Sequence, residues 1–207
     1  MSRPFIIGVG GFTSNVGKTT LMCQLLRAFP GWEAIKTTRG HYRSCGKDAT
    51  ACCVSHLLAE EPLVRSGRAD TYEDGKDTGR YWDAGASNVH WLIATENQVC
   101  KGINEAISRV SSDGVFVEGN SFSQFIQPDY FLMVRRNAVG GVKKSARAVM
   151  PYVSALFVSD QIESPTIQDR HENLEQCTNI FGPPSLPLLV SQLRALVDSR
   201  QVVESII

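Results

Sequence analysis

The chain lacks an excess of charge of either sign, a long hydrophobic run and a secretion signal. Lys and Arg number 21 and Asp and Glu number 21, so the formal net charge is zero, and nothing favours nucleic acid or an anionic membrane as a partner. The longest apolar runs, such as residues 130–134, are far too short to span a bilayer. The opening residues MSRPFIIGVGG predict a buried strand rather than a signal peptide. We therefore expect a cytoplasmic protein with no nucleic-acid partner and no membrane partner.

Disulfides and paired C-x2-C metal motifs are also missing. The six cysteines belong to a chain that is expected in the cytosol, where disulfides are rare. Cys23 and Cys100 fall on apolar positions of expected helices, which predicts that both are buried in the core.

Five Cys and His residues nevertheless lie within one short stretch: His41, Cys45, Cys52, Cys53 and His56. On a helix that begins near residue 48, Cys52 and His56 are one turn apart and share a face. Cys45, Cys52 and His56 are thus a candidate second metal site, for zinc or for half of a cluster shared across a dimer. The alternative is two buried small residues and a loop thiol. We favour that alternative, because adjacent cysteines on a helix point in different directions.

Short β-branched and aromatic runs alternate with helical stretches along the chain. Seven strands are expected, at residues 5–9, 33–37, 88–94, 114–118, 130–134, 155–159 and 179–181. Helices are expected at residues 18–29, 96–110 and 187–197, where apolar residues recur on one face. This alternation predicts an α/β protein with a doubly wound, mostly parallel, seven-stranded sheet. The length of the chain suits one domain over residues 1–207.

Residues 38–85 fit the alternation poorly. No strand is expected there, and the one expected helix is short, at about residues 48–60. Loops of this length inside a compact domain tend to be functional. We treat residues 38–76 as an inserted loop–helix segment.

The stretch GGFTSNVGKTT, residues 10–20, ends like a phosphate-binding loop but lacks its first glycine. The pattern G-x-x-x-x-G-K-[ST] requires glycine at position 12, where this chain has Phe12; Gly10 and Gly11 could make the bend one residue earlier. In such loops, backbone N–H groups at a helix N-terminus bind phosphate oxygens, and Asn15 tolerates a left-handed conformation. The expected nucleotide-binding residues are Thr13, Ser14, Asn15, Val16, Gly17, Lys18, Thr19 and Thr20.

The chemistry of this loop gives separate roles to three residues. Lys18 supplies a charge to the β- and γ-phosphates, and Thr19 supplies a hydroxyl to Mg²⁺. A carboxylate at the end of a neighbouring strand completes such a site, and the strand in DGVFVEGN ends at Glu118. Lys18 and Glu118 are therefore the expected catalytic residues. Lys36 ends the second expected strand, and it either contacts phosphate or an anionic partner, or is solvated.

Four motifs follow one another between residues 12 and 120: FTSNVGKTTL, AIKTT, GKDTGRYWDAGA and VFVEGN. Together they resemble the molybdopterin-guanine dinucleotide biosynthesis accessory proteins, the MobB family of P-loop GTPases. The resemblance implies a SIMIBI-like P-loop NTPase, usually a homodimer, which binds GTP and hydrolyses it weakly. It also implies a molybdopterin-type cofactor or its biosynthetic enzyme as partner. It places Mg²⁺ on Thr19, Glu118 and Asp77, although Asp77 alone could equally be a helix N-cap.

The chain departs from that family in three places. The segment between Lys36 and Asp77 is longer than in simple members, and residues 37–41, TTRGH, replace a usual His-rich stretch. Asn120 and Ser121 replace a usual Phe-Lys pair. More loosely, GFTSNVGKT is similar to the loop of the dethiobiotin synthetases, which are ATP-dependent enzymes.

The sequence does not by itself choose between GTP and ATP. The Asn-Lys-x-Asp element with which many GTPases read guanine is missing. Ser159 and Asp160 are candidates to contact the base, although a capping role for Asp160 is the simpler interpretation. Three functions stay open: an accessory GTPase of molybdenum cofactor maturation, an ATP-dependent ligase or kinase, and a metal-delivery NTPase that uses the Cys/His segment.

Overall fold

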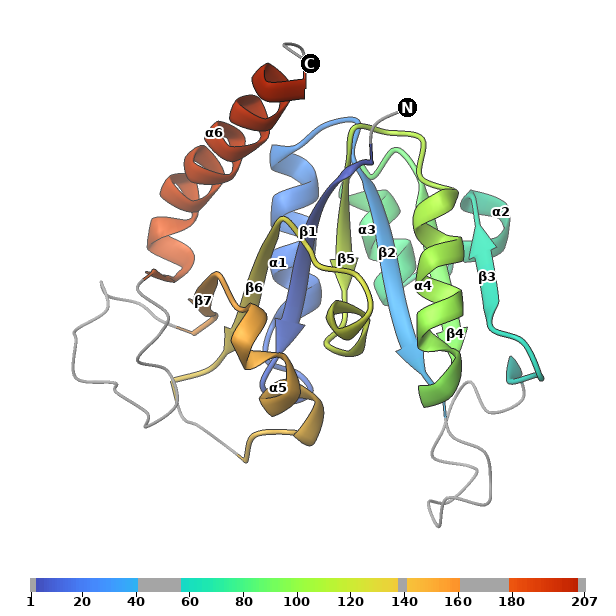
Figure 1. Ribbon diagram of the computed structural model, residues 1–207. Helices are drawn as coiled ribbons and strands as arrows, with labels where there is room; N and C mark the ends of the chain where they lie inside the picture. Colours follow the sequence, from blue (N-terminus) through green and yellow to red (C-terminus); the bar gives the residue numbers. More distant parts are fainter. Residues whose placement is uncertain (1–2, 41–56, 138–140, 161–178, 205–207) are drawn as a thin grey trace.

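A mostly parallel sheet forms the centre of the molecule (Figure 1). The computed structural model describes residues 3–40, 57–137, 141–160 and 179–204. Within these ranges the sheet has eight strands in the order β3-β4-β2-β5-β1-β6-β7-β8. All neighbouring pairs are parallel except β3 and β4, which are antiparallel. The strands are β1 (Phe5–Gly11), β2 (Glu33–Arg39), β3 (Leu63–Ser66), β4 (Val89–Ala94), β5 (Gly114–Glu118), β6 (Tyr130–Arg135), β7 (Ala155–Val158) and β8 (Ile180–Phe181).

Helices cover both faces of this sheet, as the alternating pattern predicted. One face carries α1 (Lys18–Ala28), α3 (Asp77–Asp83) and α6 (Leu186–Glu204), and the other carries α4 (Val99–Ser108) and α5 (Lys144–Val149). A short helix, α2 (Arg68–Thr71), follows the edge strand β3. The 3-10 turns are η4 (Glu96–Gln98), η5 (Ser121–Gln124), η6 (Met150–Tyr152) and η7 (Pro183–Ser185). The α/β, doubly wound, mostly parallel architecture is thus confirmed.

The two apolar cores account for this layering. The β1 side chains alternate between them: Ile7 and Val9 pack with α1, whereas Ile6 packs with α4 and α5. Strands buried on both faces need apolar residues on both faces, and the β6 run YFLMVR is buried throughout. Complete burial of each Leu, Ile or Phe contributes about 2 kcal/mol, so the central strands are the best-anchored part of the chain.

The prediction of seven strands was wrong by one. The eighth, β3, lies in the region where no strand was expected and pairs with the outer edge of β4. Only Val64 of its four residues is buried, so the sequence carries little of the alternation that marks a strand. Its conformation depends on pairing with β4, which is a tertiary interaction.

Two local predictions also fail. The helix expected at residues 48–60 does not extend over residues 57–60, which contain no α-helix; the rest of that segment lies outside the described ranges. Cys23 is buried as expected, but Cys100 is exposed. The buried face of α4 instead consists of residues such as Val99, Ile103 and Ala106. None of the described helices is long and apolar enough to cross a membrane.

Candidate functional site

The loop between β1 and α1 has a backbone that only certain residues adopt. Gly17 immediately precedes α1 with a φ of 95°, and Asn15 has a φ of 59°. Both values lie in the left-handed region, which disfavours most side chains but which Gly and Asn tolerate. The left-handed conformation expected at Asn15 is therefore present. Alternating left-handed and right-handed residues turn successive N–H groups inward, which forms an anion-binding concavity.

Phe12 replaces the usual glycine without disturbing this loop. Strand β1 continues through Gly11, so the bend expected at Gly10 and Gly11 does not occur there. A Cβ on Gly11 would lie 2.8 Å from Cδ of Lys18 and 2.9 Å from Cγ2 of Val16. Glycine is needed at position 11 because the stem of Lys18 passes directly over the strand end. Phe12 is buried in the apolar core on the α4 and α5 side of the sheet. Its backbone N–H donates a hydrogen bond to the Val134 carbonyl, which continues the pairing with β6.

Lys18 is held beside this loop without an acidic partner in ion-pair contact. No ion pair to Lys18 occurs within the described ranges. Burial lowers the pKa of its ammonium group, and the nearby charges of Lys36 and Lys143 lower it further, against an opposing effect of Glu118. A partly buried cation without a contacting carboxylate is a binding group for an anion.

Beside Lys18, a compact polar cluster joins four elements. Lys36 from β2 lies between two carboxylates: its Nζ is 2.6 Å from Asp77 Oδ2 and 2.6 Å from Glu118 Oε1. Thr19 at the start of α1 donates a hydrogen bond to Glu118 Oε2 over 3.2 Å. The hydroxyl of Tyr81 also donates to Glu118 Oε2. The three residues expected around Mg²⁺, namely Thr19, Asp77 and Glu118, are therefore close together.

Sheet register explains this convergence. Lys36 pairs with Glu118 across β2 and β5, and Val9 pairs with Glu118 across β1 and β5. The carboxyl ends of parallel strands meet at one edge of the sheet, so residues far apart in sequence become neighbours. Asp77 is the first residue of α3 rather than its N-cap, and its side chain reaches Lys36 instead of the helix backbone.

The charges in the cluster stabilise one another against burial. Burial lowers the pKa of Lys36, but Glu118 and Asp77 outweigh it and the pKa is raised. Burial likewise raises the pKa of Asp77, but Lys36 reverses the shift and the pKa is lowered. Burial and the Glu118 charge both raise the pKa of Tyr81 well above its usual range. These shifts favour the charged forms of Lys36 and Asp77 and the neutral phenol of Tyr81.

The loop, Lys36, Asp77 and Glu118 line one cavity of about 390 Å³. All the expected nucleotide-binding residues except Thr13 line it, and two cations that the sequence reasoning missed, Arg80 and Arg136, lie on its wall. Arg136 follows β6 directly, so its position after a strand beside β1 was the signal that could have found it. Tyr81 was also missed; its place one helical turn after Asp77 was the corresponding clue.

The remaining candidates lie at other places in the fold. Asp160 Oδ1 accepts a hydrogen bond from the Asn137 backbone N–H over 2.8 Å; Asn137 belongs to no helix, so this bond is not a helix cap. Ser159 packs on the loop, where a Cβ on Gly17 would lie 2.9 Å from its own Cβ. Cys45, Cys52 and His56 lie outside the described residues. Within the described ranges, no group of three or more His, Cys, Asp and Glu side chains could hold a metal ion.

Comparisons with known proteins add little to this picture. No protein-family model matches the chain, and no curated protein matches it. Among solved structures, the signal recognition particle receptor FtsY from Elizabethkingia anophelis, in complex with GDP, matches with a TM-score of 0.37 and 16% identity over 77% of this chain. The match spans 50% of that protein. At this TM-score, the function must be argued from the geometry of the chain itself.

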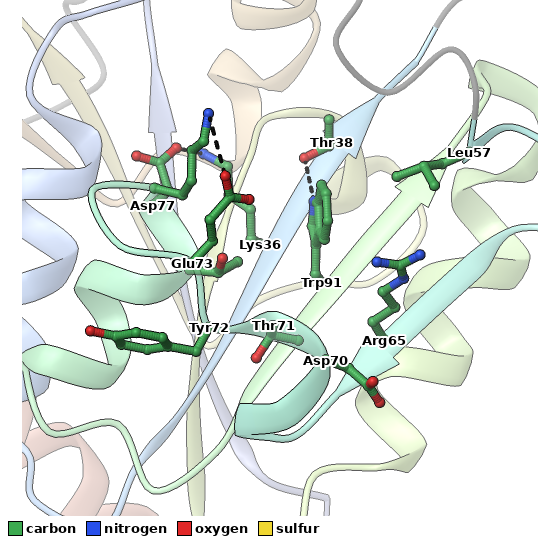
Figure 2. A pocket seen from close by; sticks show the side chains of 12 residues that line it. Lys36, Thr38, Leu57, Arg65, Asp70, Thr71, Tyr72, Glu73, Asp77 and Trp91 are labelled. Atoms are coloured by element: carbon green, nitrogen blue, oxygen red, sulfur yellow. Dashed lines mark hydrogen bonds and ion pairs between the residues drawn. The ribbon is translucent and has the colours of Figure 1, made fainter.

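A second, larger cavity adjoins the first. It has a volume of about 680 Å³ and shares Lys36 and Asp77 with the loop cavity. Figure 2 shows the hydrogen bond that Trp91 Nε1 donates to Thr38 Oγ1, 2.9 Å long, with Arg65 beside the indole. The Arg65 guanidinium lies 5.9 Å from the indole centroid. An aromatic wall with charges of both signs suits a planar polar molecule.

Proposed function

We propose that the chain binds the triphosphate of GTP in the loop cavity and hydrolyses it weakly with Mg²⁺. The observation that carries this proposal is Lys18, a partly buried ammonium without an ion-pair partner in the described ranges, beside a loop with left-handed Asn15 and Gly17. A polyphosphate supplies the missing negative charge, and the loop N–H groups supply hydrogen bonds to its oxygens.

The residues around Glu118 fit a magnesium ion. Mg²⁺ prefers oxygen ligands, keeps several waters and needs only one or two protein carboxylates beside the substrate phosphates. The Thr19 hydroxyl and the Glu118 and Asp77 carboxylates are such oxygens. The Thr19 hydroxyl donates to Glu118, and both carboxylates pair with the Lys36 ammonium that lies between them. When bound, the ion would neutralise charge on the phosphates. Lys18 orients the phosphates, and Tyr81 and Thr19 hold the Glu118 carboxylate.

Removal of the Lys18 charge is the direct test. Lys18→Ala should weaken GTP binding by about 2–3 kcal/mol, the magnitude of a lost charge-assisted contact. Isothermal titration of wild type and variant with GTP and Mg²⁺ measures this loss. Lys101→Ala is the matched control, since Lys101 is exposed and pairs only with Glu61 in the described ranges. Equal GTP affinity in wild type and Lys18→Ala would contradict the proposal.

The more specific role that we propose is accessory GTPase, as a cytoplasmic homodimer, in maturation of a molybdopterin-type cofactor. Each of the four motifs that resemble the MobB family contributes at least one member of the cluster: Thr19, Lys36, Asp77 with Tyr81, and Glu118. The adjoining cavity with Trp91 offers a place for a planar pterin. Pterin binding can be monitored by quenching of tryptophan fluorescence. Binding to the wild type that is lost in Trp91→Leu would support this role. Strong preference for ATP over GTP would count against it.

A second candidate is ATP-dependent activation of a small molecule. It is favoured by the same 680 Å³ cavity, because a substrate there would lie next to Lys36 and Asp77 and hence next to the transferred phosphate. Parallel titrations with ATP and GTP separate the two candidates. ATP turnover that is slow alone and accelerated by a small-molecule acceptor would favour the second.

A further inference from the structure

We propose that the chain has a second anion site, in a cavity that shares Lys18 with the loop cavity, for a small polyanion with phosphate or carboxylate groups. The site is a cavity of about 450 Å³. This goes beyond the proposed function, because Arg39, Lys143 and Lys144 line this cavity and not the loop cavity.

The charges in this cavity have one sign. Lys18, Arg39, Lys143 and Lys144 line it, and no carboxylate is among the described residues of its wall. Among the described residues, the one ion pair that reaches this group joins Arg39 to the exposed Glu96 over 3.4 Å, and such surface pairs contribute little. Cations gathered in a hollow repel one another and attract anions into it. The remaining wall carries hydroxyls of Thr13, Ser121 and Ser145, which can donate to the same oxygens.

Hydrogen bonds join the segments that form this wall and fix the position of Lys143. Asn120 Oδ1 accepts the Gly11 N–H over 2.8 Å, and Asn120 Nδ2 donates to the Gly11 carbonyl over 3.0 Å. The Lys143 N–H donates to the Phe12 carbonyl over 3.0 Å. The Lys143 ammonium donates to Ser14 Oγ over 2.6 Å. The segment before α5 is thereby fixed against the end of β1 (Figure 1).

Gly119 and Thr37 pack closely at the floor of the cavity. Gly119 has a φ of 147°, and a Cβ there would clash with Thr37 Oγ1. Thr37 Oγ1 in turn donates to the Glu118 carbonyl over 2.7 Å. The floor therefore lies directly beside Glu118, and the cavity shares Lys18 with the loop cavity.

The test is a titration of protein already saturated with GTP in Mg²⁺-free buffer, so that the loop cavity is occupied. Inorganic pyrophosphate is the probe in one arm and tricarballylate in the other. We expect at least one of them to bind with one site per chain, and the arm that binds identifies phosphate or carboxylate as the group recognised.

Variants locate the binding. Arg39→Gln and Lys144→Gln replace exposed residues, and each should weaken binding of the probe about tenfold, the loss of one charge-assisted contact. Neither should change GTP affinity more than about twofold. Lys101→Gln, the matched surface control, should leave both unchanged.

Two results would overturn the proposal: neither probe binds the GTP-saturated protein, or the bound probe is insensitive to Arg39→Gln and Lys144→Gln. If the chain binds no GTP at all, the same titrations on free protein still decide the matter. Weaker binding in Lys144→Gln and unchanged binding in Arg136→Gln, which alters only the loop cavity, would then support this site while the nucleotide proposal fails.

Discussion

Lys36 shows how one side chain can take a role that its sequence position left open. The sequence allowed a solvated lysine or a contact to phosphate, and the structure instead places its ammonium between Asp77 and Glu118. The solvated alternative was wrong, because the side chain is only 17% exposed and both carboxylates lie within ion-pair distance. In the protein alone, Lys36 compensates charge that would otherwise be buried unpaired beside Tyr81.

Glu118 gives the prediction at this scale. Glu118→Gln keeps the shape of the side chain but removes the charge that a magnesium ion needs, so GTP binding should persist while Mg²⁺-dependent hydrolysis falls at least about tenfold. Phosphate release under saturating GTP measures the effect, and thermal unfolding checks that the variant is folded. Glu96→Gln, at an exposed position, is the control. Unchanged hydrolysis in Glu118→Gln would show that the metal is held elsewhere.

At the scale of elements, the loop between β1 and α1 depends on backbone conformation more than on a match to the usual sequence motif. The usual first glycine is missing, yet the strand runs on through Gly11 and the loop turns after Phe12. Besides Gly11, the geometry requires glycine at position 17, where the backbone is left-handed and an added Cβ would lie 2.9 Å from the Ser159 Cβ. This explains why a chain with Phe12 keeps the loop.

Two loop variants test this reasoning as a pair. Gly17→Ala forces a Cβ to within 2.9 Å of Ser159 and a side chain into a left-handed conformation, so GTP affinity should fall more than about tenfold and stability by about 1–2 kcal/mol. Asn15→Gly accepts the same backbone freely, and should change either quantity by less than about 0.5 kcal/mol. Titration and chemical denaturation measure both. Equal effects of the two variants would contradict the conformational explanation.

At the edge of the sheet, the local hydrophobic pattern of the sequence failed to predict a whole strand. Strand β3 has one buried residue and pairs only with β4, and α2 and α3 are short helices that the periodicity of the sequence did not reveal. Such segments take their conformation from the neighbours that they meet. Their position matters for function, because α3 delivers Asp77 and Tyr81 to the site.

At the scale of the whole molecule, a buried polar network links segments at the end of the sheet opposite the cluster around Glu118. His90 Nε2 lies 2.6 Å from Glu33 Oε2, and Glu33 Oε1 accepts hydrogen bonds from the N–H groups of Ser111 and Ser112. Burial by itself raises the pKa of Glu33, but the bonds from His90, Ser111 and Ser112 outweigh it and lower the pKa from 4.5 to about 2. The network connects β2, β4 and the segment before β5.

This network predicts a specific acid sensitivity of the free energy of unfolding. Because the folded pKa of Glu33 is depressed, its stabilisation is fully present above about pH 4.5 and is lost as pH falls towards 2. The shift corresponds to about 3 kcal/mol. Glu33→Gln should therefore be less stable by about 2–3 kcal/mol at pH 7 and lose less stability than wild type between pH 5 and pH 2. Urea denaturation at a series of pH values measures both.

Glu61→Gln serves as the comparison, since Glu61 is exposed and pairs with Lys101 on the surface. Its stability should follow the wild-type pH profile within about 0.5 kcal/mol. Parallel acid profiles of wild type and Glu33→Gln would show that Glu33 does not carry the depressed pKa.

The sequence by itself determined the layered α/β architecture and the strand–loop–helix unit that carries Lys18 and Thr19, because periodicity and glycine conformation act over a few neighbouring residues. Tertiary structure alone decided what these residues touch. Strand register placed Lys36 opposite Glu118, and packing of α3 on α1 added Asp77 and Tyr81. The edge strand β3 and the basic cavity beside Lys18 likewise exist only where distant segments meet, which no local pattern encodes.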